Sequence, residues 1–279
     1  MFPKVRYFFK FLQYILFSRH SKGHGIHSPF VYNIVSRVFQ DKRVDDHLKQ
    51  VLNIHRKYKN SSAPLVFEEM GAGSHTKPHR IPLIKAITKQ NHSLVSTTVG
   101  KNIRNSSVSR KYGSLLYRLV KHFKPGHLLE IGTSLGISTL YIAQGAPGSD
   151  FITLEGVKEK RKIAKKLAGE LKLENIHFMS GDFDLELPKI LRQTKRFDFI
   201  FFDGNHTRNA TLNYFYACLE NVHPESVFVF DDIHWSKEME EAWDAIKMHP
   251  RVRVSIDLFQ AGIVFFKKEI TQGHYTIKF

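Results

Sequence analysis

The sequence predicts an α/β protein with a seven-stranded, mostly parallel sheet, an antiparallel C-terminal hairpin, and a basic, helical N-terminal extension. Three observations support this prediction. After residue 126, short apolar runs alternate with segments of helical periodicity, a pattern typical of a parallel sheet with helices on both faces. The last two apolar runs follow each other with no helix between them, which indicates a hairpin. All the net positive charge lies before residue 126.

The charge is unevenly divided along the 279 residues, whose net charge is +16. Residues 1–125 hold 23 Lys and Arg against 5 Asp and Glu, whereas residues 126–279 hold 19 against 21. Such a field attracts an anionic partner, such as RNA, a lipid surface or an acidic substrate, or it serves solubility alone. We place the domain boundary just before the helix that leads into the sheet, between an N-terminal region, 1–108, and a second domain, 109–279.

The extension is predicted to be mainly helical. In residues 2–19, apolar side chains recur at three- and four-residue spacing among basic ones, which indicates an amphipathic helix. This helix either lies in the interface of an anionic membrane or packs on its own domain. Ser28 and Pro29 begin a second helix, residues 45–59 form a third, and residues 109–123 lead to the sheet.

A glycine-rich segment, VFEEMGAGS at residues 66–74, carries the spacing E-x-G-x-G. No regular helical pattern follows it, so we interpret it as a loop on the substrate side rather than a second cofactor loop. The polar and basic segments 75–92 and 100–111 are expected to be mobile. The single cysteine, Cys218, excludes an internal disulfide and fits a reducing compartment. We therefore expect a cytoplasmic protein, with the inner face of the membrane as a peripheral location.

The second domain has the element order of a Rossmann-like sheet. Ligands of such sheets bind at the carboxyl ends of the strands, so the residues that follow each strand are candidates for a site. We expect strands at 128–131, 150–154, 176–180, 197–202, 226–230, 252–258 and 262–267, and helices from 137 and at 157–171, 185–191, 210–219 and 237–247.

The first of these strands ends in EIGTSLG, with Glu130, Gly132 and Gly136. Glycine lets a ligand lie against bare backbone, and the following helix N-terminus offers unpaired N–H groups. Such a turn serves dinucleotides, which use G-x-G-x-x-G, or S-adenosylmethionine (SAM), or it is a plain α/β turn. Because Glu130 would repel a pyrophosphate but suits an ammonium and a sulfonium, we favour SAM.

Acidic residues end the next two strands. Glu155 follows the second strand at the distance that one βαβ unit spans, where it can accept hydrogen bonds from both ribose hydroxyls of a nucleoside. Asp182, after Gly181 at the end of the third strand, is placed to meet the adenine amino group. Together with the glycine loop, these acids predict a nucleoside pocket.

The fourth and fifth strands end in DGNH and DD, which contain Asp203, His206, Asp231 and Asp232. In a parallel sheet these three carboxylates converge, and without a counter-ion they would repel one another. Hard oxygen ligands in such a cluster suit Mg²⁺, Mn²⁺ or Ca²⁺, with magnesium expected here. A metal-bound hydroxyl has a lowered pKa, and His206 can take its proton or merely cap a helix.

Residues from about 125 to the C-terminus resemble class I SAM-dependent methyltransferases, more narrowly the metal-dependent O-methyltransferases of the catechol and macrocin O-methyltransferase type. The DGNH turn is similar to the macrocin type, in which a histidine base follows a D-G-x-H turn. The group often has Asp-Asn or Glu-Asp where this chain has Asp-Asp. The resemblance implies cofactor contacts from Glu130, Gly132, Thr133, Ser134, Gly136, Ser138, Glu155, Gly181, Asp182 and Asp203, metal ligation by Asp203, Asp231 and Asp232, and His206 as the base.

The sequence-based hypothesis is methyl transfer from SAM to a metal-bound hydroxyl of a small phenol, sugar or lipid-linked acceptor. One alternative is methylation of a hydroxylated nucleoside in RNA, suggested by the basic half, although no aromatic-rich RNA-reading motif is evident. Another is a non-catalytic SAM-binding protein attached to a membrane or to RNA. The expected partners are the small-molecule acceptor and an anionic membrane surface, and a homodimer is left open.

Overall fold

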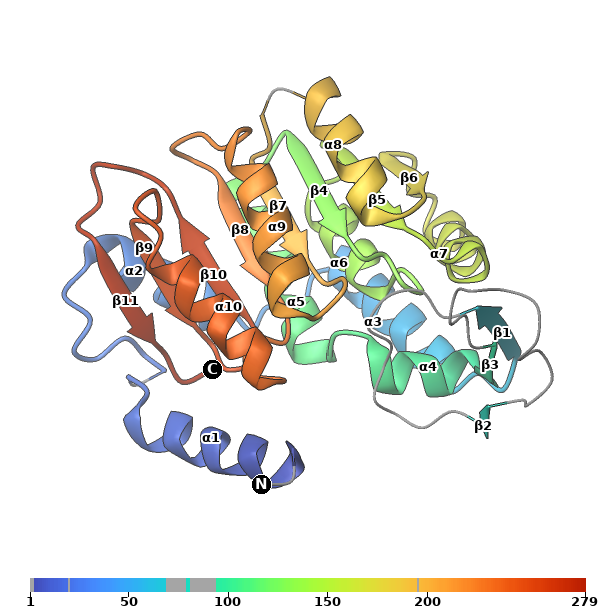
Figure 1. The fold of residues 1–279 in the computed structure, drawn as a ribbon, viewed down its shortest axis with the longest axis horizontal. Helices are drawn as coiled ribbons and strands as arrows, with labels where there is room; N and C mark the ends of the chain where they lie inside the picture. Colours follow the sequence, from blue (N-terminus) through green and yellow to red (C-terminus); the bar gives the residue numbers. More distant parts are fainter. Residues whose placement is uncertain (1–2, 20, 69–78, 81–93, 195) are drawn as a thin grey trace.

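A central eight-stranded sheet organises the molecule, in the order β11-β9-β10-β8-β7-β4-β5-β6 (Figure 1). The structure is a computed structural model that describes residues 3–19, 21–68, 79–80, 94–194 and 196–279. The strands of the sheet are β4 (His127–Ile131), β5 (Asp150–Glu155), β6 (Ile176–Ser180), β7 (Phe199–Phe202), β8 (Val227–Phe230), β9 (Val254–Asp257), β10 (Gly262–Phe265) and β11 (Gly273–Thr276).

All seven predicted strands are present, and the hairpin prediction is confirmed in detail. Strands β6, β5, β4, β7 and β8 pair in parallel, and β10 inserts antiparallel between β8 and β9. The eighth strand, β11, was not predicted. It pairs in parallel with β9 at the sheet edge, and its sequence GHYT lacks the apolar run that marks the others.

Helices cover both faces of the sheet, and strand alternation assigns side chains to each face. Buried side chains on one face pack with α5 (Arg110–Phe123), α6 (Ile137–Gly145) and α7 (Lys158–Glu170). Those on the other face pack with α8 (Phe183–Gln193), α9 (Arg208–Leu219) and α10 (Lys237–Lys247). In β4, for example, Leu128 belongs to the first cluster and Leu129 to the second.

The N-terminal region contains the predicted helices together with a small sheet that was not predicted. Its elements are α1 (Pro3–Phe17), α2 (Pro29–Ile34), the π-helix η1 (Val35–Phe39), α3 (Asp46–Lys59), β1 (Pro64–Glu68), β2 (His79–Arg80), β3 (Leu94–Thr98) and α4 (Val99–Ser106). As expected, Ser28 caps α2, by accepting a hydrogen bond from the Val31 N–H. None of the described helices is long and apolar enough to cross a bilayer.

One expectation for this region was wrong, and two others fall mostly on residues that the structure does not describe. The segment 100–111 was expected to be mobile, but it includes most of α4, whose Val99 and Ile103 are buried at 4% and 2% exposure. A buried apolar face holds this helix in place despite the polar composition of the segment. Of the glycine-rich segment 66–74, only residues 66–68, at the end of β1, are described. The rest of it, and nearly all of 75–92, lie outside the described residues.

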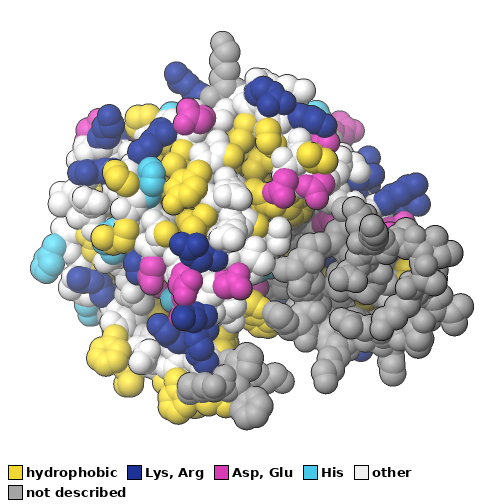
Figure 2. Space-filling view, viewed as in Figure 1, with side chains coloured by type: hydrophobic (Ala, Val, Ile, Leu, Met, Phe, Trp, Pro, Cys, Tyr) yellow, Lys and Arg dark blue, Asp and Glu magenta, His cyan; other side chains and the backbone are white. Residues whose placement is uncertain are grey.

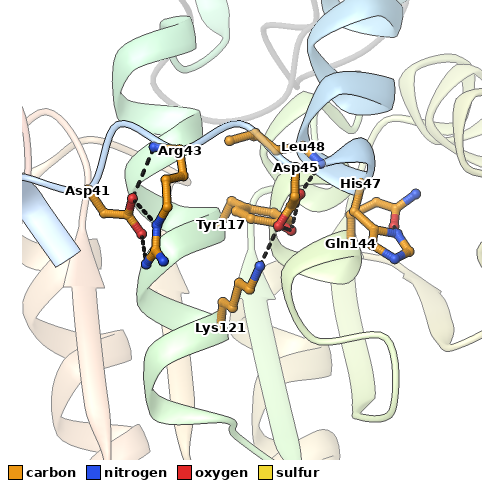
Figure 3. A network of polar contacts seen from close by, with 8 residues as sticks. All are labelled: Asp41, Arg43, Asp45, His47, Leu48, Tyr117, Lys121 and Gln144. Atoms are coloured by element: carbon orange, nitrogen blue, oxygen red, sulfur yellow. Dashed lines mark hydrogen bonds and ion pairs between the residues drawn. The ribbon is translucent and has the colours of Figure 1, made fainter. Parts of the chain in front are cut away.

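A polar network joins the N-terminal region to the sheet domain (Figure 3). The carboxylate of Asp45 caps α3 by accepting a hydrogen bond of 2.9 Å from the Leu48 N–H. It also accepts hydrogen bonds from the Tyr117 hydroxyl at 2.7 and 2.8 Å and pairs with Lys121, both on α5. The apolar cluster on this face likewise includes residues of α2, η1 and α3. Helix capping and helix packing are therefore coupled where the two regions meet.

Candidate functional site

The glycine loop lies between β4 and α6, in close contact with the end of β7. Gly132 has a φ of +107°, and a Cβ there would lie 2.3 Å from the carbonyl oxygen of Asp203. Gly136 has a φ of +83°, and a Cβ there would lie 2.7 Å from the Cβ of Ala164. It begins α6 without a side-chain cap, so the first N–H groups of this helix are left for a ligand or water.

Glu130 lies beneath this loop and is fully buried. Its Oε2 accepts hydrogen bonds from the hydroxyls of Thr139 at 2.5 Å and Thr153 at 2.6 Å. Its Oε1 is buried without a hydrogen-bond partner among the described residues. Burial raises the pKa of Glu130, and hydroxyls including that of Ser138, in the first turn of α6, oppose this rise. An unpartnered carboxylate oxygen at this position suits a cationic ligand group.

Glu155, at the end of β5, holds the loop in its conformation. Its Oε2 accepts a hydrogen bond of 2.7 Å from the N–H of Ser134, which has a left-handed φ of 49°. Its Oε1 accepts one of 2.8 Å from the Val157 N–H, and Thr133 Oγ1 lies 2.5 Å from Thr153 Oγ1. Each carboxylate oxygen has a further lone pair, so the predicted ribose contact of Glu155 stays a prediction that this arrangement allows.

Asp182 is exposed, next to Gly181, at the start of α8. It caps this helix by accepting a hydrogen bond of 2.8 Å from the Asp184 N–H. The capping role accounts for this residue type by itself, and the predicted contact with adenine stays a prediction.

The three predicted carboxylates lie together at the carboxyl ends of β7 and β8. These strands pair in parallel, with Phe202 opposite Phe230, so Asp203 and Asp231 leave the sheet side by side. Burial and the neighbouring carboxylates Asp231 and Asp232 raise the pKa of Asp203 well above its ordinary value. Burial and Asp232 likewise raise the pKa of Asp231. Like charges are therefore concentrated at this edge of the sheet.

His206 lies next to this cluster, in the turn after β7. Its Nε2 is 3.5 Å from Oδ1 of Asp203, and its side chain is 30% exposed. Burial raises the pKa of Asp232 and the charge of nearby His206 lowers it. A partly exposed imidazole with an acidic neighbour can take up a proton and be stabilised as its cation.

The donor chemistry of this cluster suits a hard divalent cation. In the part of the chain that the structure describes, however, no three His, Cys, Asp or Glu side chains are arranged to hold a metal ion. The three predicted ligands thus lie close enough to repel one another. Their side chains are not arranged to coordinate one metal ion.

Two aromatic residues beside the cluster, Tyr7 and Trp235, were not predicted as site residues. Burial, with Asp232 and Asp231 nearby, raises the pKa of Tyr7, which comes from α1. The ring of Tyr7 makes an edge contact with Trp235 at 6.4 Å between centroids, and Trp235 is 47% exposed. Trp235 closely follows the fifth strand in sequence, whereas no spacing pattern connects Tyr7 to this edge. His234, by contrast, forms a hydrogen bond of 2.8 Å between its Nε2 and Oδ2 of Asp257, which connects the segment after β8 to the end of β9.

The comparisons with known proteins identify the kind of domain and its fold. Residues 129–233 match a family model described as a methyltransferase domain. An O-methyltransferase from Bacillus cereus, solved in complex with SAH, is 19% identical, with a TM-score of 0.53 over 80% of this chain and 92% of that one. An SAH-bound methyltransferase from Podospora anserina is 15% identical, with a TM-score of 0.57 over 86% and 97%.

A third similar structure is the O-methyltransferase TomG from Streptomyces achromogenes, solved with SAM. It is 18% identical, with a TM-score of 0.53 over 85% of this chain and 94% of that one. These likenesses confirm the predicted Rossmann-like fold.

Proposed function

The chain carries a methyltransferase domain with the class I, SAM-dependent fold, and from this premise we propose that it transfers the methyl group of SAM to a hydroxyl oxygen of a small acceptor. One observation carries the proposal. The Cα of Gly132 lies against the carbonyl of Asp203, so the glycine loop is in contact with the turn that ends in His206. A cofactor on the loop and a proton acceptor on the turn would share one site.

The residues divide the work as follows. Glu130 would receive the ammonium group of the amino-acid part of SAM, the first amides of α6 its carboxylate, and Glu155 the ribose. SAM supplies a methyl group on a positively charged sulfur, which leaves as a neutral thioether when the acceptor oxygen forms its bond to carbon. The acceptor hydroxyl loses its proton, and His206 takes it at Nδ1, the ring nitrogen that does not face Asp203. Asp203 would then stabilise the imidazolium.

The divalent metal is the second part of the proposal. Asp203, Asp231 and Asp232 would hold it, and a cation there would offset their mutual repulsion. Its chemistry would be to lower the pKa of the acceptor hydroxyl. The metal is supported only by the chemistry of these three carboxylates. The proposed proton transfer to His206 does not depend on the metal.

The experiment uses SAM labelled in its methyl group, incubated with the protein and fractionated cell extract. We expect the label to enter a small hydroxyl compound, to be lost with His206→Ala, and to fall in EDTA and return with Mg²⁺. Label in small molecules that is indifferent to EDTA would overturn the metal part and keep the transfer. No incorporation into any fraction, with SAM binding intact, would overturn the proposal in favour of a non-catalytic SAM-binding protein.

RNA is the second candidate acceptor, supported by the excess of 23 basic over 5 acidic residues in positions 1–125. Phosphate contacts make RNA affinity fall steeply with salt. Label in the RNA fraction that disappears at high salt would therefore establish this acceptor in place of a small molecule.

A further inference from the structure

Helix α1 has an inner face that is fixed to the sheet domain. The Tyr14 hydroxyl donates a hydrogen bond of 2.6 Å to the Ile277 carbonyl and accepts one of 2.8 Å from the Phe279 N–H. The rings of Tyr7 and Phe11 contact Phe259 at 5.0 and 5.1 Å between centroids. The helix is therefore held in one orientation on the domain.

The opposite face of α1 carries a stripe of exposed apolar side chains, which we call the outer stripe. At about 100° per residue, its five members fall within roughly 100° of the helix circumference, half a turn away from the inner face. The outer stripe consists of Val5, Phe8, Phe9, Leu12 and Leu16, which are 42%, 57%, 52%, 39% and 74% exposed.

The outer stripe lies at the boundary of the molecule. In Figure 1, α1 is the lowest element, beside the sheet domain rather than within it, and Figure 2 shows hydrophobic side chains gathered along the same lower edge. Two phenylalanines and two leucines in a continuous exposed row are more than scattered surface residues, and such patches mark interaction sites.

The N-terminal segment that carries the outer stripe has a net positive charge, although Glu240 of α10 pairs with Arg6 and Lys10. Helix α1 contains three basic and no acidic residues, and the first 40 residues of the chain contain six basic and no acidic ones. A helix with bulky apolar side chains on one side, in a segment of net positive charge, matches the interface of an anionic bilayer, where acyl chains receive the apolar face and the negative surface attracts the segment.

We propose that the outer stripe of α1 docks the protein on the surface of an anionic lipid membrane. A second copy of the chain is the other occupant to consider. A two-fold contact repeats the same patch on both subunits, so pairing through α1 would bring two N-terminal segments of net positive charge together, and Glu240 offsets only part of this charge. An anionic bilayer removes this repulsion and buries the same apolar surface.

If the protein transfers methyl groups as proposed above, its docking on a membrane also indicates the chemical class of the methyl acceptor. The inner face of α1 places Tyr7 against Trp235, whose backbone N–H donates a hydrogen bond of 2.9 Å to the carbonyl of Asp232. The carboxylate edge of the sheet is therefore adjacent to the helix that meets the membrane. An acceptor that enters from there would be an amphiphile with a hydroxyl head group.

The test is flotation of the purified full-length protein with vesicles of phosphatidylcholine, with and without phosphatidylglycerol. We expect binding to the anionic vesicles, weak binding to the zwitterionic ones, and loss at high salt. The variant Phe9→Ser/Leu16→Ser should bind roughly tenfold more weakly, because two apolar side chains are lost from the buried surface. The matched control is Met248→Ser, which replaces a 65% exposed apolar residue outside α1 and should bind as the wild type does.

Three outcomes would overturn the proposal: no binding to anionic vesicles, equal binding by the double variant, or a stable dimer in light scattering that the double variant dissociates. The substituted side chains are exposed, so unchanged thermal unfolding of the variant confirms that folding is intact. Flotation needs neither SAM nor turnover. A failure of the proposed methyl transfer would thus leave this result standing, and a failure of docking would leave the methyl transfer standing.

Discussion

The N–H of Ser134 donates a hydrogen bond of 2.7 Å to Oε2 of Glu155, so the end of β5 fixes the glycine loop that follows β4. Ser134 has a φ of 49°, a conformation that a non-glycine residue adopts at a cost. The second oxygen of Glu155 is engaged by the Val157 N–H. One carboxylate thus maintains both the loop and its own position.

Replacing Glu155 should therefore weaken SAM binding through the loop as well as through any direct contact. We expect Glu155→Ala to raise the Kd for SAM by about 10- to 100-fold, because two hydrogen bonds to a charged group are lost. Glu155→Gln keeps one strong acceptor oxygen and should lie between the two. Isothermal titration calorimetry with SAM measures this, and equal affinities for all three proteins would contradict the role of Glu155.

Gly132 tests the contact between the loop and the turn after β7. A Cβ there would lie 2.3 Å from the carbonyl oxygen of Asp203, in addition to the strain at a φ of +107°. We expect Gly132→Ala to lower the free energy of unfolding by about 1–3 kcal/mol and to weaken SAM binding. Gly148→Ala is the control, since a Cβ there meets nothing within 4 Å. Urea unfolding of both variants decides the matter, and equal stabilities would contradict the close approach.

The parts of this site that could be predicted from the sequence are those that follow strands. Asp203 and Asp231 each come directly after four buried apolar residues, and parallel pairing then brings them to one edge. Gly132 and Gly136 predict a turn because residues other than glycine disfavour a positive φ. The strength of these predictions comes from local pattern combined with a general rule of sheet topology.

Tyr7 and β11 could not be predicted in the same way. The position of α1 depends on hydrogen bonds of the Tyr14 hydroxyl with the backbone of Ile277 and Phe279, more than 260 residues away in sequence. Helical periodicity does not encode such a distant partner. The hydrophobic pattern of α1 left two alternatives open, membrane contact or packing on the domain. The structure shows the packing on one face and leaves the other face exposed, so the two interpretations are compatible.

His206 should affect turnover rather than SAM binding. As the proton acceptor it contributes only when the hydroxyl is attacked, so His206→Ala should reduce kcat by about 10²- to 10⁴-fold with an unchanged Kd for SAM. His249 precedes β9, at the opposite edge of the sheet, and His249→Ala serves as the control. A helix-capping role would instead lower thermal stability with kcat nearly intact, and that result would contradict the assignment.

His55 makes stability depend on pH in a predictable direction. It is 2% exposed in α3, with its Nδ1 3.1 Å from the Tyr141 hydroxyl, and burial lowers its pKa from 6.5 to about 4. Because the unfolded chain takes up this proton at a higher pH than the folded one, the folded state loses stability as pH falls from 6.5 towards 4, by up to about 3 kcal/mol. We expect the difference in unfolding free energy between pH 7 and pH 4.5 to be smaller for His55→Gln, which keeps a hydrogen-bonding group but cannot titrate. Urea unfolding of both proteins at the two pH values measures this, and parallel pH profiles would show that His55 is protonated in the folded state as readily as in the unfolded one.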